Sequence, residues 1–180
     1  MANSTIVSDL KKAVIKEIVN DDMFFYAINS PDVSDIEFAD ELIGKNIFTY
    51  HQNPETITKV GTFMTFQVHI PKTFGKSKVL IAPTLEIWII SHQNHMKVKN
   101  IPKVTDNRND YISMLLDKKF NGRSVLGGSS NSKNNLHLCG RLKLISNTEG
   151  AFSPEYLYRR MIFETADIND SVCGWGVLCL

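Results

Sequence analysis

Imidazoles, clustered carboxylates and thiols are the side chains of this sequence that could do chemistry. His92 and His95 stand three residues apart at the end of an alternating apolar run, and no carboxylate lies beside them. In an extended chain a separation of three places two rings on opposite faces, so the pair does not predict a metal site. The acids Asp35, Glu37, Asp40 and Glu41 cluster on a short helix, and acids near a helix start commonly stabilise the helix dipole.

The thiols and the motif content point away from catalysis in the same way. The three cysteines are Cys139, Cys173 and Cys179. An odd count without an export signal argues against a disulfide framework, and the spacing does not fit a zinc site. Neither a nucleophile elbow, a zinc-protease motif nor a phosphate-binding loop occurs. We therefore expect no enzymatic activity, no metal and no cofactor.

Size and composition indicate one folded domain. The 180 residues are 43% hydrophobic and 22% charged, with a net charge of +1. This charge gives no general attraction to nucleic acid or to a membrane surface. No run approaches the roughly 18–20 apolar residues that cross a bilayer, and the N-terminus does not resemble a signal peptide. We expect no membrane partner and synthesis in a cytoplasm.

Helical spacing appears in three places. Apolar residues three and four apart predict a helix over residues 5–28, with a second short helix from Ser34, whose spacing to Glu37 fits a capping box, to Gly44. The stretch Thr105–Phe120 predicts a capped amphipathic helix, with Thr105 as the cap and Asn121-Gly122 as the end.

Alternating apolar residues predict the strands. The runs 60–70 and 79–91 form an antiparallel pair around a basic turn at 71–78, and Pro83 interrupts the second run. Two more strands are expected at Leu136–Ser146 and Tyr158–Glu164, joined by Asn147–Glu155. The fold class is therefore α+β: an antiparallel or mixed sheet with an N-terminal helix and one central helix packed on it.

Residues 1–180 are expected to form this single domain with two additions. The glycine-, serine- and asparagine-rich segment 121–135 predicts a flexible arm that a partner orders. The apolar tail at 171–180 would favour aggregation if exposed, so we expect it to dock on its own sheet or on a neighbouring subunit.

Arg159 and Arg160 lie in the last strand, while Asp106 and Asp110 begin the central helix. Two interpretations remain open: an ion pair that holds the helix on the sheet, or a bridge between subunits. Basic residues also gather in loops, among them Lys72, Lys76 and Lys78.

Several segments resemble the neck proteins of tailed bacteriophages, in the tail terminator or head–tail joining class. These segments are the helix Ile6–Ile28, the strand end Trp88–His92, the helix start Asp106–Asp110 with its continuation Leu115–Asp117, and the last strand Arg160–Glu164 with Asp167–Asn169.

The resemblance implies a structural virion protein that is assembled in the host cytoplasm. Such proteins form rings, usually hexamers, that end the tail tube and join it to the head connector or stopper proteins. A ring contact is heterologous and closes by rotation. The resemblance implies subunit contacts at Arg108, Asp110, Arg123, Arg159, Arg160 and Trp175, and non-specific contact of Lys72, Lys76 and Lys78 with the DNA backbone in the channel.

Two alternatives stay open. One is a head-completion ring protein (stopper or adaptor) of the same neck. The other is a non-viral cytoplasmic adaptor domain.

Overall fold

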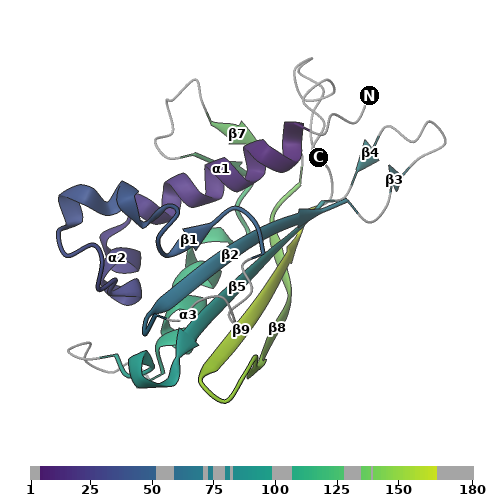
Figure 1. The fold of residues 1–180 in the computed structure, drawn as a ribbon. Helices are drawn as coiled ribbons and strands as arrows, with labels where there is room; N and C mark the ends of the chain where they lie inside the picture. The colour runs from purple at the N-terminus through teal and green to yellow at the C-terminus, as the bar shows by residue number, and fades with distance from the viewer. Residues whose placement is uncertain are drawn as a thin grey trace.

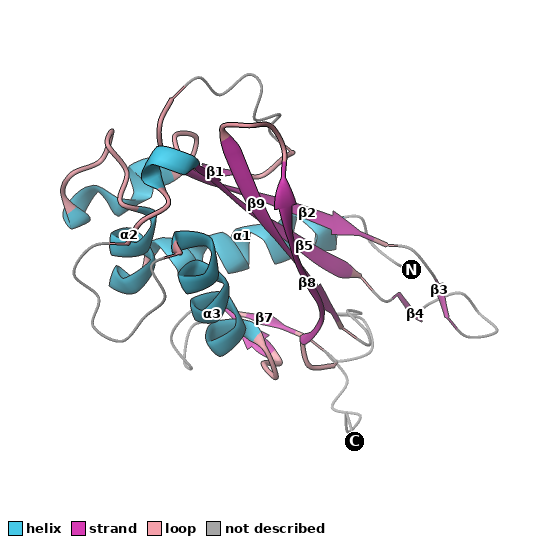
Figure 2. Cartoon of the chain, turned by 90° about the horizontal axis from the view of Figure 1, so that it is seen from below, coloured by secondary structure: helices cyan, strands magenta, loops and turns pink. Residues whose placement is uncertain are grey.

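A five-stranded sheet carries helices on one of its faces (Figures 1 and 2). The computed structural model describes residues 5–51, 59–70, 73–74, 80–81, 83–98, 107–127, 135–138 and 140–165. The strand order is β1 (Ile47–Phe48), β2 (Thr62–His69), β5 (Thr84–His92), β9 (Tyr156–Glu164) and β8 (Lys143–Ala151). β1 is parallel to β2 and the other neighbours are antiparallel, which confirms the predicted α+β class with a mixed sheet.

The N-terminal helical region differs from the prediction of one helix over 5–28. It contains two helices, α1 (Thr5–Val19) and α2 (Asp22–Ile28). The break has a local cause, because the Asp21 carboxylate accepts a hydrogen bond from the backbone N–H of Met23 at 3.0 Å and so caps a new helix.

The second short helix is the 3-10 helix η1 (Ile36–Leu42). Its cap is Asp35, which accepts from Glu37 N, so the predicted capping role of Ser34 was wrong. Gly44 follows η1 with φ +86°, a left-handed conformation that favours glycine, in agreement with its predicted role as the stop.

The central helix is α3 (Arg108–Phe120), which starts three residues later than predicted. Asn107 is its cap and accepts from the backbone N–H groups of Asn109 and Asp110 at 2.9 and 3.3 Å. The cap prediction for Thr105 was therefore wrong, and residues 99–106 lie outside the described part of the chain. A short 3-10 turn, η3 (Gln93–His95), follows β5.

The inner face of the sheet and the helices share one apolar core. Alternate residues of β2, β5 and β9 point into this core, where they meet one stripe of α1 and one of α3. The core includes Met64, Phe66, Ile87, Ile89, Met161 and Phe163 from the sheet, and Leu10, Val14, Ile18, Ile112, Leu116 and Phe120 from the helices.

Two small ribbons extend the sheet connections. β3 (Thr73–Phe74) pairs with β4 (Leu80–Ile81), as the predicted turn requires, and Pro83 separates β4 from β5. β6 (Val125–Leu126) pairs with β7 (Leu136–His137) at the base of the predicted arm. Residues 128–134 of that arm, and the tail at 171–180, lie outside the described residues.

The last two sheet strands correct the predicted boundaries. The run predicted as one strand, Leu136–Ser146, divides into β7 and the start of β8, and β8 continues to Ala151. Residues 147–151, among them the polar Asn147, Thr148 and Glu149, remain in the ladder because β8 is an edge strand in the sheet order, mostly exposed and paired only with β9. The connection to β9 is therefore only the turn 152–155.

Candidate functional site

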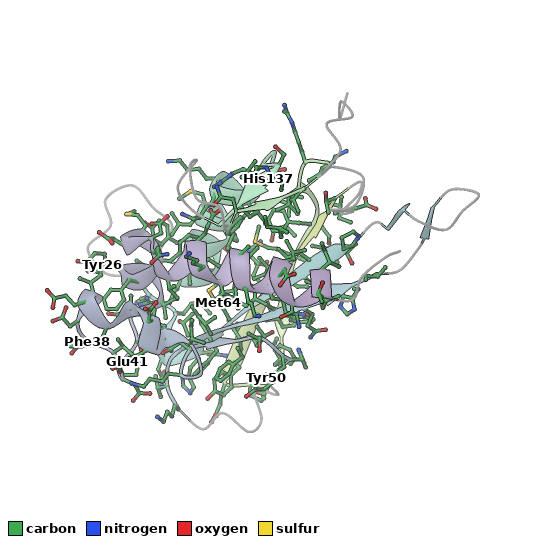
Figure 3. The ribbon with its side chains drawn as sticks, turned by 90° about the horizontal axis from the view of Figure 1, so that it is seen from above. Tyr26, Phe38, Glu41, Tyr50, Met64 and His137 are labelled. Atoms are coloured by element: carbon green, nitrogen blue, oxygen red, sulfur yellow. The ribbon has the colours of Figure 1, made fainter. Side chains whose placement is uncertain are left out.

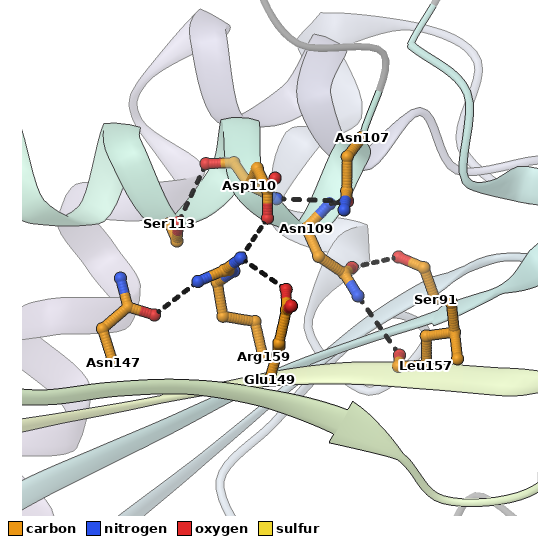
Figure 4. A network of polar contacts seen from close by, with 9 residues as sticks. All are labelled: Ser91, Asn107, Asn109, Asp110, Ser113, Asn147, Glu149, Leu157 and Arg159. Atoms are coloured by element: carbon orange, nitrogen blue, oxygen red, sulfur yellow. Dashed lines mark hydrogen bonds and ion pairs between the residues drawn. The ribbon is translucent and has the colours of Figure 1, made fainter.

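The start of α3 and the β8–β9 edge line a cleft of about 320 Å³, and Figure 4 shows the polar contacts between these elements. Arg159 is among the residues that line the cleft. Its guanidinium donates to Asn147 Oδ1 at 3.0 Å, to Glu149 Oε2 at 2.8 Å and to the carboxylate of Asp110. The contact between Arg159 and Asp110 confirms the interpretation of an ion pair that holds the central helix on the sheet.

A chain of side-chain hydrogen bonds runs from this cleft into the protein. Asn109 receives a hydrogen bond from Ser91 Oγ at 2.7 Å and donates to the carbonyl of Leu157 at 3.2 Å. Ser91 also contacts the hydroxyl of Thr62 at 2.8 Å, and Thr62 contacts His95 Nδ1 at 3.0 Å. Ser91 and Thr62 are fully buried, so these hydroxyls connect elements and do not face a substrate.

The imidazole of His95 is held neutral at the end of this chain. The side-chain amide nitrogen of Asn29 lies 3.3 Å from Nε2 of this imidazole. Burial, and then the positive charge of Arg108, lower the pKa of His95 from 6.5 to about 4.

Arg108 lies inside the protein beside this imidazole. It is 4% exposed and donates to the carbonyls of His95 at 2.7 Å and Lys97 at 3.0 Å, and to that of Ala27 at the end of α2. Burial lowers the pKa of its guanidinium. The structure therefore gives Arg108 an internal role between α2, η3 and α3, which differs from the predicted surface role in a subunit contact.

The outer face of the sheet carries an aromatic cluster that no described helix covers. The rings of Trp88, Phe152 and Tyr158 lie 4.8–5.2 Å apart between centroids, and His51 lies 5.6 Å from Trp88. Trp88, Phe152 and Tyr158 are only half-buried. We call Trp88, Phe152, Tyr158 and Arg160 the open-face cluster.

Arg160 is fixed within this cluster. It lies 5.3 Å from the Trp88 ring centroid and donates to both carboxylate oxygens of Glu86, at 2.8 and 3.0 Å. Burial alone would raise the pKa of Glu86, but hydrogen bonds from Arg160 and Trp88 outweigh it, so the pKa is lowered and the carboxylate stays charged. The same hydrogen bond raises the pKa of Arg160.

The comparisons with known proteins add one finding. A family model matches residues 18–165, which include every strand of the five-stranded sheet and the helices from α2 onward. The chain belongs to the YomW family. No curated protein and no solved structure matches it.

The remaining predicted contact residues of this YomW-family chain fall in different places. Arg123 forms a two-pronged ion pair with the buried Glu17 of α1, at 2.9 and 3.2 Å. Arg160 belongs to the open-face cluster, on the opposite side of the sheet from Arg159. Trp175 and the lysines Lys72, Lys76 and Lys78 lie outside the described residues.

The polar groups of this YomW-family chain are mostly engaged with one another. Among the described residues, no group of three histidines, cysteines or acids is arranged to hold a metal. In the same residues no helix is long and apolar enough to cross a membrane. The open-face cluster holds half-exposed aromatic rings and a guanidinium group in fixed positions. Side chains of these types are enriched at protein–protein interfaces.

Sequence reasoning missed this open-face cluster. The signal was present in part, because Trp88 alternates with the core residues Ile87 and Ile89 and must lie on the other face of β5. Its neighbours Phe152 and Tyr158 come from the β8–β9 hairpin, far along the chain, and only the strand order brings them to Trp88.

Proposed function

We propose that this chain is a structural virion protein of the tailed-bacteriophage neck. In this role it forms a ring of six copies, in keeping with its resemblance to tail terminators, that ends the tail tube and joins it to the head connector. The observation that carries the proposal is the open-face cluster, because it offers half-buried aromatic rings and a fixed arginine on a sheet face that no described helix covers.

Such groups are those that interfaces use most. Tryptophan, tyrosine and arginine are enriched among residues that dominate binding energy, and they act best where they are already held in place. Here the two hydrogen bonds to Glu86 hold Arg160, and Arg160 covers Trp88. The proposal assigns this face to the neighbouring protein of the tail or head connector, and it requires neither a cofactor nor a catalytic residue.

The proposal is tested with the full chain and with isolated tail tubes. Purified protein is examined by sedimentation velocity and by negative-stain imaging, alone and with tubes, for rings that cap tube ends. Deletion of the gene should yield filled heads and complete tails that do not join. Joined infectious particles in the deletion strain would refute the proposal.

One matched pair of variants tests the open face itself. Thr148→Arg places a long cation on an exposed position of β8, on the same face as Tyr158 and Arg160. Ser8→Arg makes a similar change on exposed α1. We expect Thr148→Arg to abolish tube capping and Ser8→Arg to leave it intact. A folded Thr148→Arg variant that caps tubes normally would contradict this assignment of the face.

The same face could equally serve a head-completion ring or a non-viral adaptor. A head-completion protein would bind the portal assembly and not the tube end. An adaptor would stay monomeric in the presence of tubes.

A further inference from the structure

The strand at one edge of the five-stranded sheet is long and, within the described part of the chain, pairs on one side only. This strand, β8 (Lys143–Ala151), is the last in the sheet order, and its partner is β9 (Figures 1 and 2). In an edge strand about every second residue turns its backbone N–H and C=O groups away from the sheet. These groups can pair with one further extended segment.

The opposite edge of the sheet offers no comparable strand. There β1 has only two residues, Ile47–Phe48. Tyr50 follows it outside any strand, is 57% exposed and lies at the outside of the molecule (Figure 3). Pairing that extends the sheet is therefore expected at β8.

The second half of β8 lacks most of the features that block an edge strand. Lysine side chains, prolines and bulges are the usual ones. The bulge between Leu144 and Ser146 lies in the first half of the strand, and residues 146–151 continue in regular register with β9. These six residues contain neither lysine nor proline. They span about 20 Å at 3.3 Å per residue, so an extended segment of the same length can pair along them.

Glu149 decides which segment fits this edge. It lies on the inner face of the sheet, because its ladder partner Arg159 is two residues from the core residue Met161. Its side chain is 71% exposed. An added strand places one residue directly opposite Glu149, on the same face. A carboxylate there would repel Glu149, and an apolar side chain would remove water from its charge.

The surroundings of Glu149 favour a positive charge at that position. The guanidinium of Arg159 is shared between the carboxylates of Glu149 and Asp110, so these three side chains carry one negative charge in excess (Figure 4). Glu149 and Arg159 line the cleft of about 320 Å³, together with Asn107 and Asn109 from the start of α3. This cleft gives room for a side chain as long as lysine or arginine.

A second copy of the chain does not supply this charge. The lysine of β8 is Lys143, and it points to the outer face because its neighbour Leu144 packs against the core. Glu149 points to the inner face, since the bulge between them shifts the alternation of side chains. Two β8 strands paired with each other would therefore bring no lysine opposite Glu149.

We infer that β8 binds an extended segment of another protein as a sixth strand, with a lysine or arginine of that segment opposite Glu149. Backbone hydrogen bonds supply affinity, and the basic side chain in the cleft selects the segment. This contact is separate from the open-face cluster and does not depend on the proposed neck function.

Peptide selection tests the contact. The immobilised full-length chain is offered a displayed library of random peptides of about ten residues, long enough to cover the edge. The same selection is made on Glu149→Lys and on Glu37→Lys, a control at an exposed acid of η1. We expect the parent and the control to enrich peptides that carry one lysine or arginine among β-branched or aromatic residues. Glu149→Lys should instead enrich an acidic residue at that position, which would also show that the variant is folded.

A peptide selected on the parent is then measured in solution. Its dissociation constant should be at least about tenfold higher for Glu149→Lys and unchanged for Glu37→Lys. Hydrogen exchange followed by NMR locates the bound peptide. The amides of residues 146–151 that face away from β9 should exchange fast in the free chain and slowly in the complex.

Selected peptides without a basic residue, or a selection that yields no peptide, would overturn this assignment of β8. So would an unchanged affinity for Glu149→Lys, or protection confined to amides outside β8. Protection of the outer amides in the free chain would show that another part of the chain already occupies the edge. Protection that rises with protein concentration would show that two copies pair there, and either result would refute binding of a separate partner.

Discussion

Replacing Arg108 by methionine would leave three backbone carbonyl oxygens in the protein interior without their donor. The guanidinium is 4% exposed and bonds to the carbonyls of Ala27, His95 and Lys97, which belong to α2, η3 and the segment after it. Methionine keeps much of the length and apolar volume of arginine, so the substitution removes mainly these hydrogen bonds.

The expected loss follows from the number of bonds and from the cost of burying a charge. A hydrogen bond from a charged donor contributes about 1.5–3 kcal/mol, and an unsatisfied buried carbonyl costs about 1–3 kcal/mol. Part of this loss of stability is offset, because burying the charge of Arg108 costs free energy and methionine carries no charge. The lowered pKa of Arg108 reflects that cost. We expect the free energy of unfolding to fall by about 2–4 kcal/mol, a large share of the roughly 5–15 kcal/mol of an ordinary domain.

Urea unfolding followed by circular dichroism measures this change. Arg108→Lys should fall between the parent and Arg108→Met, because one ammonium group does not reach all three carbonyls in the geometry of the guanidinium. Arg141 is exposed, and Arg141→Met should change stability by no more than about 0.5 kcal/mol. An Arg108→Met variant within about 1 kcal/mol of the parent, with an unchanged m-value, would refute the structural role given to Arg108.

Three further substitutions test other contacts. Folding lowers the pKa of His95 from 6.5 to about 4, so the unfolded chain binds the proton first as the pH drops. The contribution of His95 to stability is therefore full above about pH 6.5 and is lost toward pH 4. His95→Gln should remove about 1–2 kcal/mol of this pH dependence, measured by urea unfolding at several pH values. Glu17→Gln breaks the buried ion pair with Arg123 and should lower the unfolding free energy by about 2–4 kcal/mol. Gly150→Ala would place a Cβ 2.6 Å from Tyr158 Oη, so the ring must leave the open-face cluster, and tryptophan fluorescence should shift with a loss of about 1 kcal/mol.

Each of these substitutions has a matched control at an exposed position. His137→Gln, Glu164→Gln and Thr148→Ala should behave as the parent does. A His95→Gln variant with the pH profile of the parent would show that this imidazole does not titrate with folding. An unchanged Glu17→Gln stability, or an unchanged Gly150→Ala fluorescence spectrum, would show that the corresponding contact does not hold its region together.

The sequence predicted the sheet well where apolar residues alternate strictly. Met64 and Phe66, and Ile87 and Ile89, point inward as their period of two requires. It failed where one local polar contact decides the backbone. The apolar stripe of the first helix continues in register past residue 20, and only the hydrogen bond from Met23 N to the Asp21 carboxylate divides it into two helices.

The site residues show the same division. The ion pair of Arg159 with Asp110 could be predicted, because a helix start and a neighbouring strand offered opposite charges. The internal position of Arg108 could not, since an arginine normally indicates the surface. Its acceptors are backbone carbonyls, such as that of Ala27, and the residue types of a sequence do not reveal which carbonyls lack a partner.

The two faces of the sheet therefore contribute to different properties. The inner face is closed by α1 and α3 and accounts for most of the buried apolar surface. On the outer face, Glu86 and Trp88 fix Arg160, although an ion pair with a partly exposed arginine contributes little to stability, about 0–1 kcal/mol. What the pairing does provide is a fixed geometry of charge and rings. A surface whose side chains are already ordered loses less conformational entropy on association, so this face can bind a partner more tightly than its area alone would allow.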